Sequence, residues 1–173
     1  GNAIDENCDG RVSNNASTSV TFADEGQVTE FCGSYDRING DLLVDYTTIV
    51  SLDLSCLAGV TGSITISNND YLESINLSEL TILQHMYVEG NNVLETLDVG
   101  NYQMLDNGSF YFAQNPTLTT IDFSSLELIK DGNFIVSDNT SLMNMLVPSL
   151  TMVQDSTVQF WSLPSISDLD LSA

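Results

Sequence analysis

The sequence predicts a mainly β protein, folded as a single right-handed β-solenoid with coils of 22 to 24 residues. One phrase recurs at that period, G-x-φ-x-φ-x-x-N-x-x-φ-x-x-φ-x-φ-x-x-φ, where φ is an apolar residue. Its clearest copies begin at Gly62, Gly108 and Gly132. The apolar residues of each copy alternate in two short patches, and no copy holds a long helical stripe. Each coil can therefore bury its apolar face only by stacking on its neighbours.

The two patches of a copy predict two short strands, and the period allows two or three strands per turn. In the copy at Gly62 they are Ile64/Ile66 and Ile75/Leu77, each with one buried face. Strands at the same position in successive coils should pair in parallel. Weaker copies begin at Gly40 and around His85, and an incomplete last copy begins at Ser156.

An asparagine recurs three residues after the second apolar residue of each first strand: Asn69, Asn91, Asn115 and Asn139. At the ~4.8 Å spacing of adjacent strands, these amides can hydrogen-bond to one another and to turn backbone. We expect a structural ladder inside the solenoid.

The chain of 173 residues, 42% of them apolar, suits one domain overall. Residues 1–37 are expected to cap the repeats of residues 38–173, with a disulfide between Cys8 and Cys32 closing this segment. Cys56 is then left as either a half-buried thiol or an intermolecular link.

The sequence does not begin with Met and has no apolar run near the ~20 residues of a membrane span, so a processed, secreted product is expected. The acceptor pattern for N-glycosylation occurs at Asn15, Asn76 and Asn107, which agrees with that route. Asn139 has the pattern too, but its place in the ladder should enclose it.

Charge narrows the range of partners. Only 3 Lys and Arg face 24 Asp and Glu, a formal net charge of -21, which repels phosphate backbones and anionic membrane surfaces. We therefore expect neither binding to nucleic acid nor direct insertion into a membrane. The alternative is that the acidity only confers solubility.

No catalytic residue is expected. The chain has one histidine, His85, without a nucleophile motif around it, and no Gly-rich phosphate loop or His/Cys metal cluster. A carbohydrate-cleaving enzyme built on Asp98 and Asp122 is the remaining enzymatic alternative.

Two outward columns are candidate sites. Middle residues of the first strands, with Trp161 beside them, form an expected partner face of Leu43, Tyr87, Tyr111, Ile135 and Trp161. The alternative is that Tyr and Ile simply suit strands. In the second strands, Asp98 and Asp122 should lie one strand spacing apart, where Ca²⁺ could relieve their repulsion, as could splaying into solvent.

Three segments resemble the receptor L domain family: Cys32 to Val44, Leu52 to Leu57 and Gly62 to Asn69. The resemblance covers roughly residues 8 to 173 and implies a right-handed β-helix related to leucine-rich repeats. It also implies surface recognition or architecture, with ligand facing the sheet of the first strands, and it names no ligand.

The predicted function is a non-catalytic extracellular or cell-surface recognition or adhesion module that binds a protein or glycan. The alternative is a structural subunit of a filament or cell wall, assembled by end-to-end stacking of solenoids. The incomplete last copy and the odd Cys56 favour that alternative.

Overall fold

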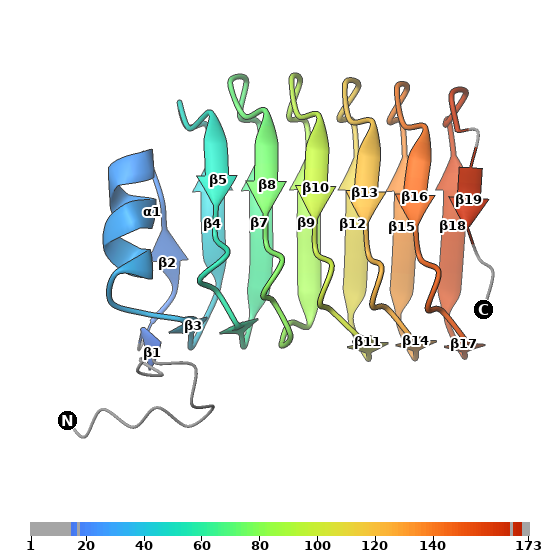
Figure 1. Ribbon diagram of the computed structural model, residues 1–173, viewed down its shortest axis with the longest axis horizontal. Coiled ribbons are helices and arrows are strands. Elements are labelled where there is room, and N and C mark those ends of the chain that lie inside the picture. Colours follow the sequence, from blue (N-terminus) through green and yellow to red (C-terminus); the bar gives the residue numbers. More distant parts are fainter. Residues whose placement is uncertain (1–14, 17, 167, 171–173) are drawn as a thin grey trace.

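The computed structural model describes residues 15, 16 and 18–166, and the backbone of residues 168–170. The chain winds into a β-solenoid of about six turns, and like strands of successive coils stand side by side (Figure 1). Every strand pair is parallel, as the repeat predicted; the pairs of the long central strands are β7 with β9, β9 with β12, and β12 with β15.

The first strand of each coil contributes to a seven-stranded sheet in the order β18-β15-β12-β9-β7-β4-β2. The strands are β2 (Val20–Thr21), β4 (Leu42–Asp45), β7 (Ser63–Ser67), β9 (His85–Glu89), β12 (Ser109–Ala113), β15 (Asn133–Ser137) and β18 (Thr157–Trp161).

The second strand of each coil contributes to a six-stranded sheet in the order β19-β16-β13-β10-β8-β5. Its strands are β5 (Ser51–Asp53), β8 (Ser74–Asn76), β10 (Thr96–Asp98), β13 (Thr120–Asp122), β16 (Asn144–Leu146) and β19 (Asp168–Asp170). The repeat that begins at Ser156, expected to be incomplete, thus supplies a strand to both large sheets.

A third side closes each coil; the period allowed a third strand per turn, but the sequence did not place it. It holds two three-stranded sheets, one of β1 (Asn15–Ala16), β3 (Arg37–Ile38) and β6 (Gly59–Val60), the other of β11 (Met104–Asp106), β14 (Leu128–Lys130) and β17 (Met152–Gln154). An isolated bridge between Gly59 and Ile82 continues the first of these sheets by one coil.

The core runs the length of the solenoid. Ile64, Ile66, Ile75 and Leu77 are all buried, which confirms the predicted alternation. The middle coils are filled by phenylalanines packed in tilted and edge-on pairs, and neighbouring ring centroids lie 5.5 to 6.3 Å apart among Phe110, Phe112, Phe123 and Phe134.

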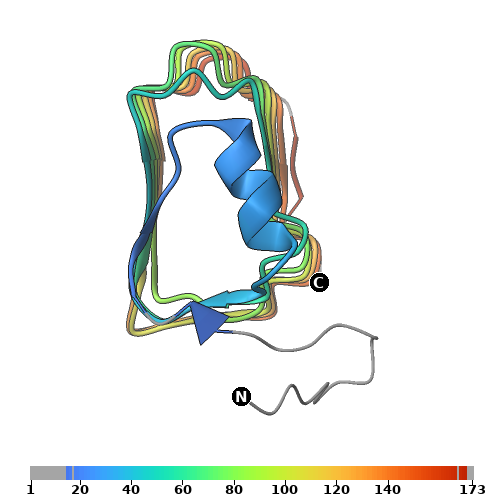
Figure 2. The same ribbon diagram turned by 90° about the vertical axis from the view of Figure 1, so that its left-hand side faces the viewer.

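A helix, α1 (Glu25–Cys32), covers the first coil at one end of this core (Figure 2). The Asp24 side chain accepts a hydrogen bond from the Gln27 backbone N–H and so caps the helix. Val28 and Phe31 are buried, and the Phe31 ring packs edge-on against Phe22 with centroids 5.5 Å apart. Packing against the open end of the core thus stabilises a helix of only eight residues.

The turn after each first strand from β4 to β18 has one left-handed residue, and in four of these turns a ladder asparagine follows it. These turn residues share φ values between 52° and 66°: Tyr46, Asn68, Gly90, Gln114, Asp138 and Ser162. The turn aims the next side chain into the interior, where the four ladder asparagines are fully buried.

The ladder asparagines bond from coil to coil, as predicted. The backbone N–H and Nδ2 of Asn69 both donate to Oδ1 of Asn91, each at 3.1 Å, and Asn91 donates in the same way to Asn115. The Asn115 N–H donates to Asn139 Oδ1 at 2.9 Å. Thr47 begins the column by donating to Asn69 Oδ1.

The predicted disulfide is wrong. Cys32, at the end of α1, is bonded to Cys56 in the first full coil, with their Cα atoms 5.5 Å apart, so it cannot pair with Cys8. Cys8 lies outside the described residues. The bond ties the capping helix to the solenoid and leaves Cys56 neither a free thiol nor an intermolecular link.

Candidate recognition surfaces

The predicted partner face lies on the outer side of the seven-stranded sheet. The strand registers place its central column in one line: Leu43, Thr65, Tyr87, Tyr111, Ile135 and Gln159. Tyr87, Tyr111 and Ile135 are half-buried in consecutive coils, and Leu43 is exposed. His85 stacks on Tyr87 with ring centroids 6.4 Å apart and widens the aromatic part of this face.

Trp161 lies one column to the side of the Tyr and Ile residues, at the end of β18, and is 42% exposed. Its register partner is Ser137. Ser67, Ala113 and Ser137 of this column are buried. The column therefore does not extend the partner face as a continuous exposed surface. The candidate partner face is thus reduced to the Tyr87–Tyr111–Ile135 line, with Trp161 at one corner.

The carboxylates of the second sheet have a structural role that the sequence reading missed. Asp98 and Asp122 are direct register partners, as predicted. Oδ1 of Asp98 accepts a hydrogen bond from the Gly100 N–H at 2.9 Å, and Oδ1 of Asp122 accepts one from the Ser124 N–H at 2.8 Å. These bonds form turns that end each strand.

The same bond from residue i+2 recurs at Asp53 and Asn76, where the donors are Ser55 and Ser78. Within the described residues there is no group of three or more His, Cys, Asp or Glu side chains that could hold a metal ion. Calcium at Asp98 and Asp122 stays a prediction.

The glycosylation candidates differ in exposure. Asn139 is 0% exposed and its Nδ2 donates to the Phe112 carbonyl at 3.0 Å, so the amide is enclosed as expected. Asn107 is exposed in a left-handed turn, Asn15 is exposed, and Asn76 is half-buried.

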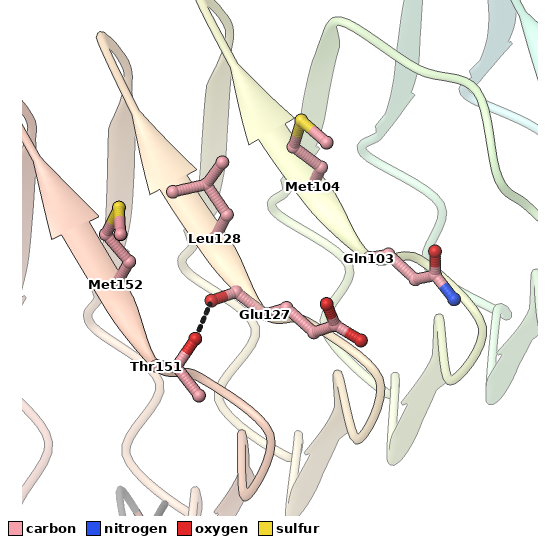
Figure 3. A pocket seen from close by; sticks show the side chains of 6 residues that line it. All are labelled: Gln103, Met104, Glu127, Leu128, Thr151 and Met152. Carbon is pink, nitrogen blue, oxygen red and sulfur yellow. Dashed lines mark hydrogen bonds between the residues drawn. The ribbon is translucent and has the colours of Figure 1, made fainter.

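A second candidate surface, absent from the sequence prediction, lies on the third side of the solenoid. A shallow groove with a volume of 190 Å³ crosses three coils (Figure 3). Met104, Leu128 and Met152 are register partners along it. The other lining residues directly precede these three: Gln103, Glu127 and Thr151.

Lys130, one of three basic residues in the chain, lies beside this groove. Its Nζ is 3.7 Å from Asp106 and 3.4 Å from Asp131, and these two carboxylates raise the pKa of the lysine. All three side chains are substantially exposed, so the pairs contribute little to stability.

Tyr102 is a buried polar residue that the repeat pattern did not single out. It is 1% exposed, and its hydroxyl donates to the Leu83 carbonyl of the preceding coil at 2.7 Å. Burial, and secondarily the charge of Asp106, raises the pKa of this hydroxyl. It occupies a position held by Leu80 and Leu126 in neighbouring coils.

Among the residues described, no helix has the length and apolar character needed to cross a membrane. The fold defines the chain as a parallel β-solenoid. Comparison with known proteins found no matching family model, no similar curated protein and no similar solved structure. The resemblance to receptor L domains stays a prediction.

Proposed function

We propose that the protein is a non-catalytic, extracellular recognition module that binds a protein or glycan through the outer face of its seven-stranded sheet. The observation that carries the proposal is the line of Tyr87, Tyr111 and Ile135, placed in consecutive coils by the strand register.

Two features support recognition as the role of this face. Aromatic side chains offer a large contact area and a polar tip, and they are enriched where proteins bind partners. Here the β-strands hold them in a rigid row, so little side-chain freedom is lost on binding. His85 and Trp161 extend the same surface on either side.

The Cys32–Cys56 disulfide supports an extracellular setting, because disulfides persist in oxidising compartments. Asp98 and Asp122 are the one carboxylate pair that the sequence offered for catalysis, and their hydrogen bonds support a non-catalytic role. Each already accepts a backbone hydrogen bond that ends its strand.

The filament alternative has less support. End-to-end stacking into a long polymer needs both ends of the solenoid open, and α1 covers the core at the first coil (Figure 2). Cys56 no longer favours it, because it is paired within the chain.

Capture experiments test the proposal. The protein, immobilised through a C-terminal tag, is probed against a glycan array and a library of extracellular protein domains. We expect Tyr87→Ser/Tyr111→Ser to lose at least tenfold in affinity for the captured ligand. Tyr71→Ser is the matched control, because Tyr71 is 60% exposed in a turn outside the sheet and should bind normally.

Circular dichroism confirms that the double variant folds. Undiminished capture by the folded double variant, or a failure of the native protein to capture any ligand, would contradict the proposal.

A further inference from the structure

The groove on the third side is a strip of exposed and half-buried apolar side chains on a highly acidic molecule. Met104 and Met152 are each 52% exposed, and Leu128 lies between them in register. Ile82, 46% exposed, is bridged to Gly59 and lies on the third side of the preceding coil. Contiguous exposed apolar surface of this kind typically marks an interaction site.

Polar residues border the strip on both sides. Gln103, Glu127 and Thr151 line one side, where the Thr151 hydroxyl donates to the Glu127 carbonyl (Figure 3). Because alternate residues of a strand share a face, the next outward column consists of Asp106, Lys130 and Gln154. Asp131 and Asp155 follow in exposed turns.

The balance of these charges is negative. The single Lys130 faces Asp106 and Asp131, so its positive charge is already matched. Glu127 on one border and Asp155 on the other add further negative charge, on a chain of net charge -21. A partner with basic flanks is favoured, and a second copy of this chain is disfavoured by repulsion.

The spacing of the strip favours a helix. Successive coils lie ~4.8 Å apart, so the three register partners span about 9.6 Å along the solenoid axis. Residues i and i+7 of an α-helix are about 10.5 Å apart along its axis, with an apolar side chain near the middle of that step. Alternate residues of an extended peptide advance about 6.6 Å each, so its second step overshoots by about 3.6 Å. Methionine side chains adapt to the small remaining mismatch of a helix.

We propose that this groove binds a cationic amphipathic helix of a partner protein, laid along the solenoid axis. Its apolar stripe contacts Met104, Leu128 and Met152, and its Lys and Arg residues face Glu127 and Asp155. The site is on a different side of the solenoid from the Tyr87–Tyr111 face and does not depend on it.

Fluorescence anisotropy with a synthetic peptide tests this proposal. The probe has roughly 18 residues, long enough to hold a helix, with Leu at i, i+3, i+4 and i+7 spacing and Lys elsewhere. A second peptide has the same composition in a shuffled order without the stripe. We expect the striped peptide to bind at least tenfold more tightly than the shuffled one, which has the same charge.

Leu128→Gln should weaken binding of the striped peptide at least tenfold. Leu43→Gln is the matched control, because Leu43 is also an outward-facing leucine of a strand, but on the other sheet. It should bind normally, as should Tyr87→Ser/Tyr111→Ser. Glu127→Gln should weaken binding a few fold at about 50 mM salt and much less at about 500 mM, where charges are screened.

Equal binding of the two peptides would show attraction by net charge alone and overturn the proposal. So would normal binding by a folded Leu128→Gln variant, or an equal loss in Leu43→Gln. Loss of binding in the tyrosine variant would instead place the helix on the other sheet.

Discussion

Replacing Asn115 with leucine tests how far the asparagine ladder stabilises the stacked coils. Leucine is close in size to asparagine, so the change removes the amide without opening a large cavity. The side chain of Asn115 accepts from the Asn91 N–H at 3.1 Å and donates to the carbonyls of Val88 and Ala113, each at 3.0 Å. The backbone N–H of residue 115 keeps its own partner, Asn139 Oδ1.

The magnitude follows from the group left without a partner. The Ala113 carbonyl still accepts from the Gly90 N–H, and the Val88 carbonyl stays within the parallel β9–β12 ladder, so the main loss falls on the Asn91 N–H. A buried polar group that loses its partner costs about 1 to 3 kcal/mol. With a urea slope of about 2 kcal/mol per M, the unfolding midpoint should fall by about 0.5 to 1.5 M.

The assay is urea unfolding followed by far-ultraviolet circular dichroism, with Asn92→Leu as the control. Asn92 is in the same coil but exposed, where its Nδ2 donates to Asp70, and we expect a change within about 0.5 kcal/mol. If the urea midpoints of Asn115→Leu and Asn92→Leu coincide, the ladder hydrogen bonds do not stabilise the fold as argued.

Two further predictions concern covalent and pH-dependent stability. Cys56→Ser removes a disulfide that closes a loop of sequence separation 24, which should cost about 3.5 kcal/mol of stability and lower the Tm by roughly 7 to 14 °C. A reductant should lower the Tm of the native protein by a similar amount and leave that of the variant unchanged. A native Tm that the reductant does not change would contradict the pairing of Cys32 with Cys56. Tyr102→Phe leaves the Leu83 carbonyl without its hydroxyl donor and should cost about 1 to 3 kcal/mol in urea unfolding. Because folding raises the pKa of Tyr102 above the unfolded value of about 10, native stability should fall as pH rises above about 10, and more steeply than in the variant; equal slopes would argue against a buried hydroxyl.

The sequence predicted the parts of the fold that repeat. A column in a solenoid places the same chemistry in the same environment several times, so Asn69, Asn91 and Asn115 could be recognised together. The line of Tyr87, Tyr111 and Ile135 was predictable for the same reason, because the register follows once the period is known.

The parts that occur once were not predicted. Helix α1 has only two buried residues, Val28 and Phe31, and includes Gly26, so its own sequence gives a weak helical signal. The pairing of Cys32 depends on which coil the end of that helix contacts, and sequence spacing does not contain this information.

The groove and Tyr102 share one physical origin, a change in coil length. Register partners in the first sheet are 22 residues apart from Ser63 to His85 and 24 apart from His85 to Ser109. The added residues fall in the corner around Asn107, whose φ of 53° turns the chain back toward the sheet. This longer corner gives the coil a full third strand, β11, on which β14 and β17 pair.

Where the shorter coil meets the longer one, it has no strand that pairs with β11. The Tyr102 hydroxyl of the longer coil donates a hydrogen bond to the Leu83 carbonyl of the shorter coil. The longer coils in turn set Met104, Leu128 and Met152 in line on the outside. A deletion that shortened this corner should therefore remove the need for the hydroxyl and disrupt the groove together, because both depend on the longer corner.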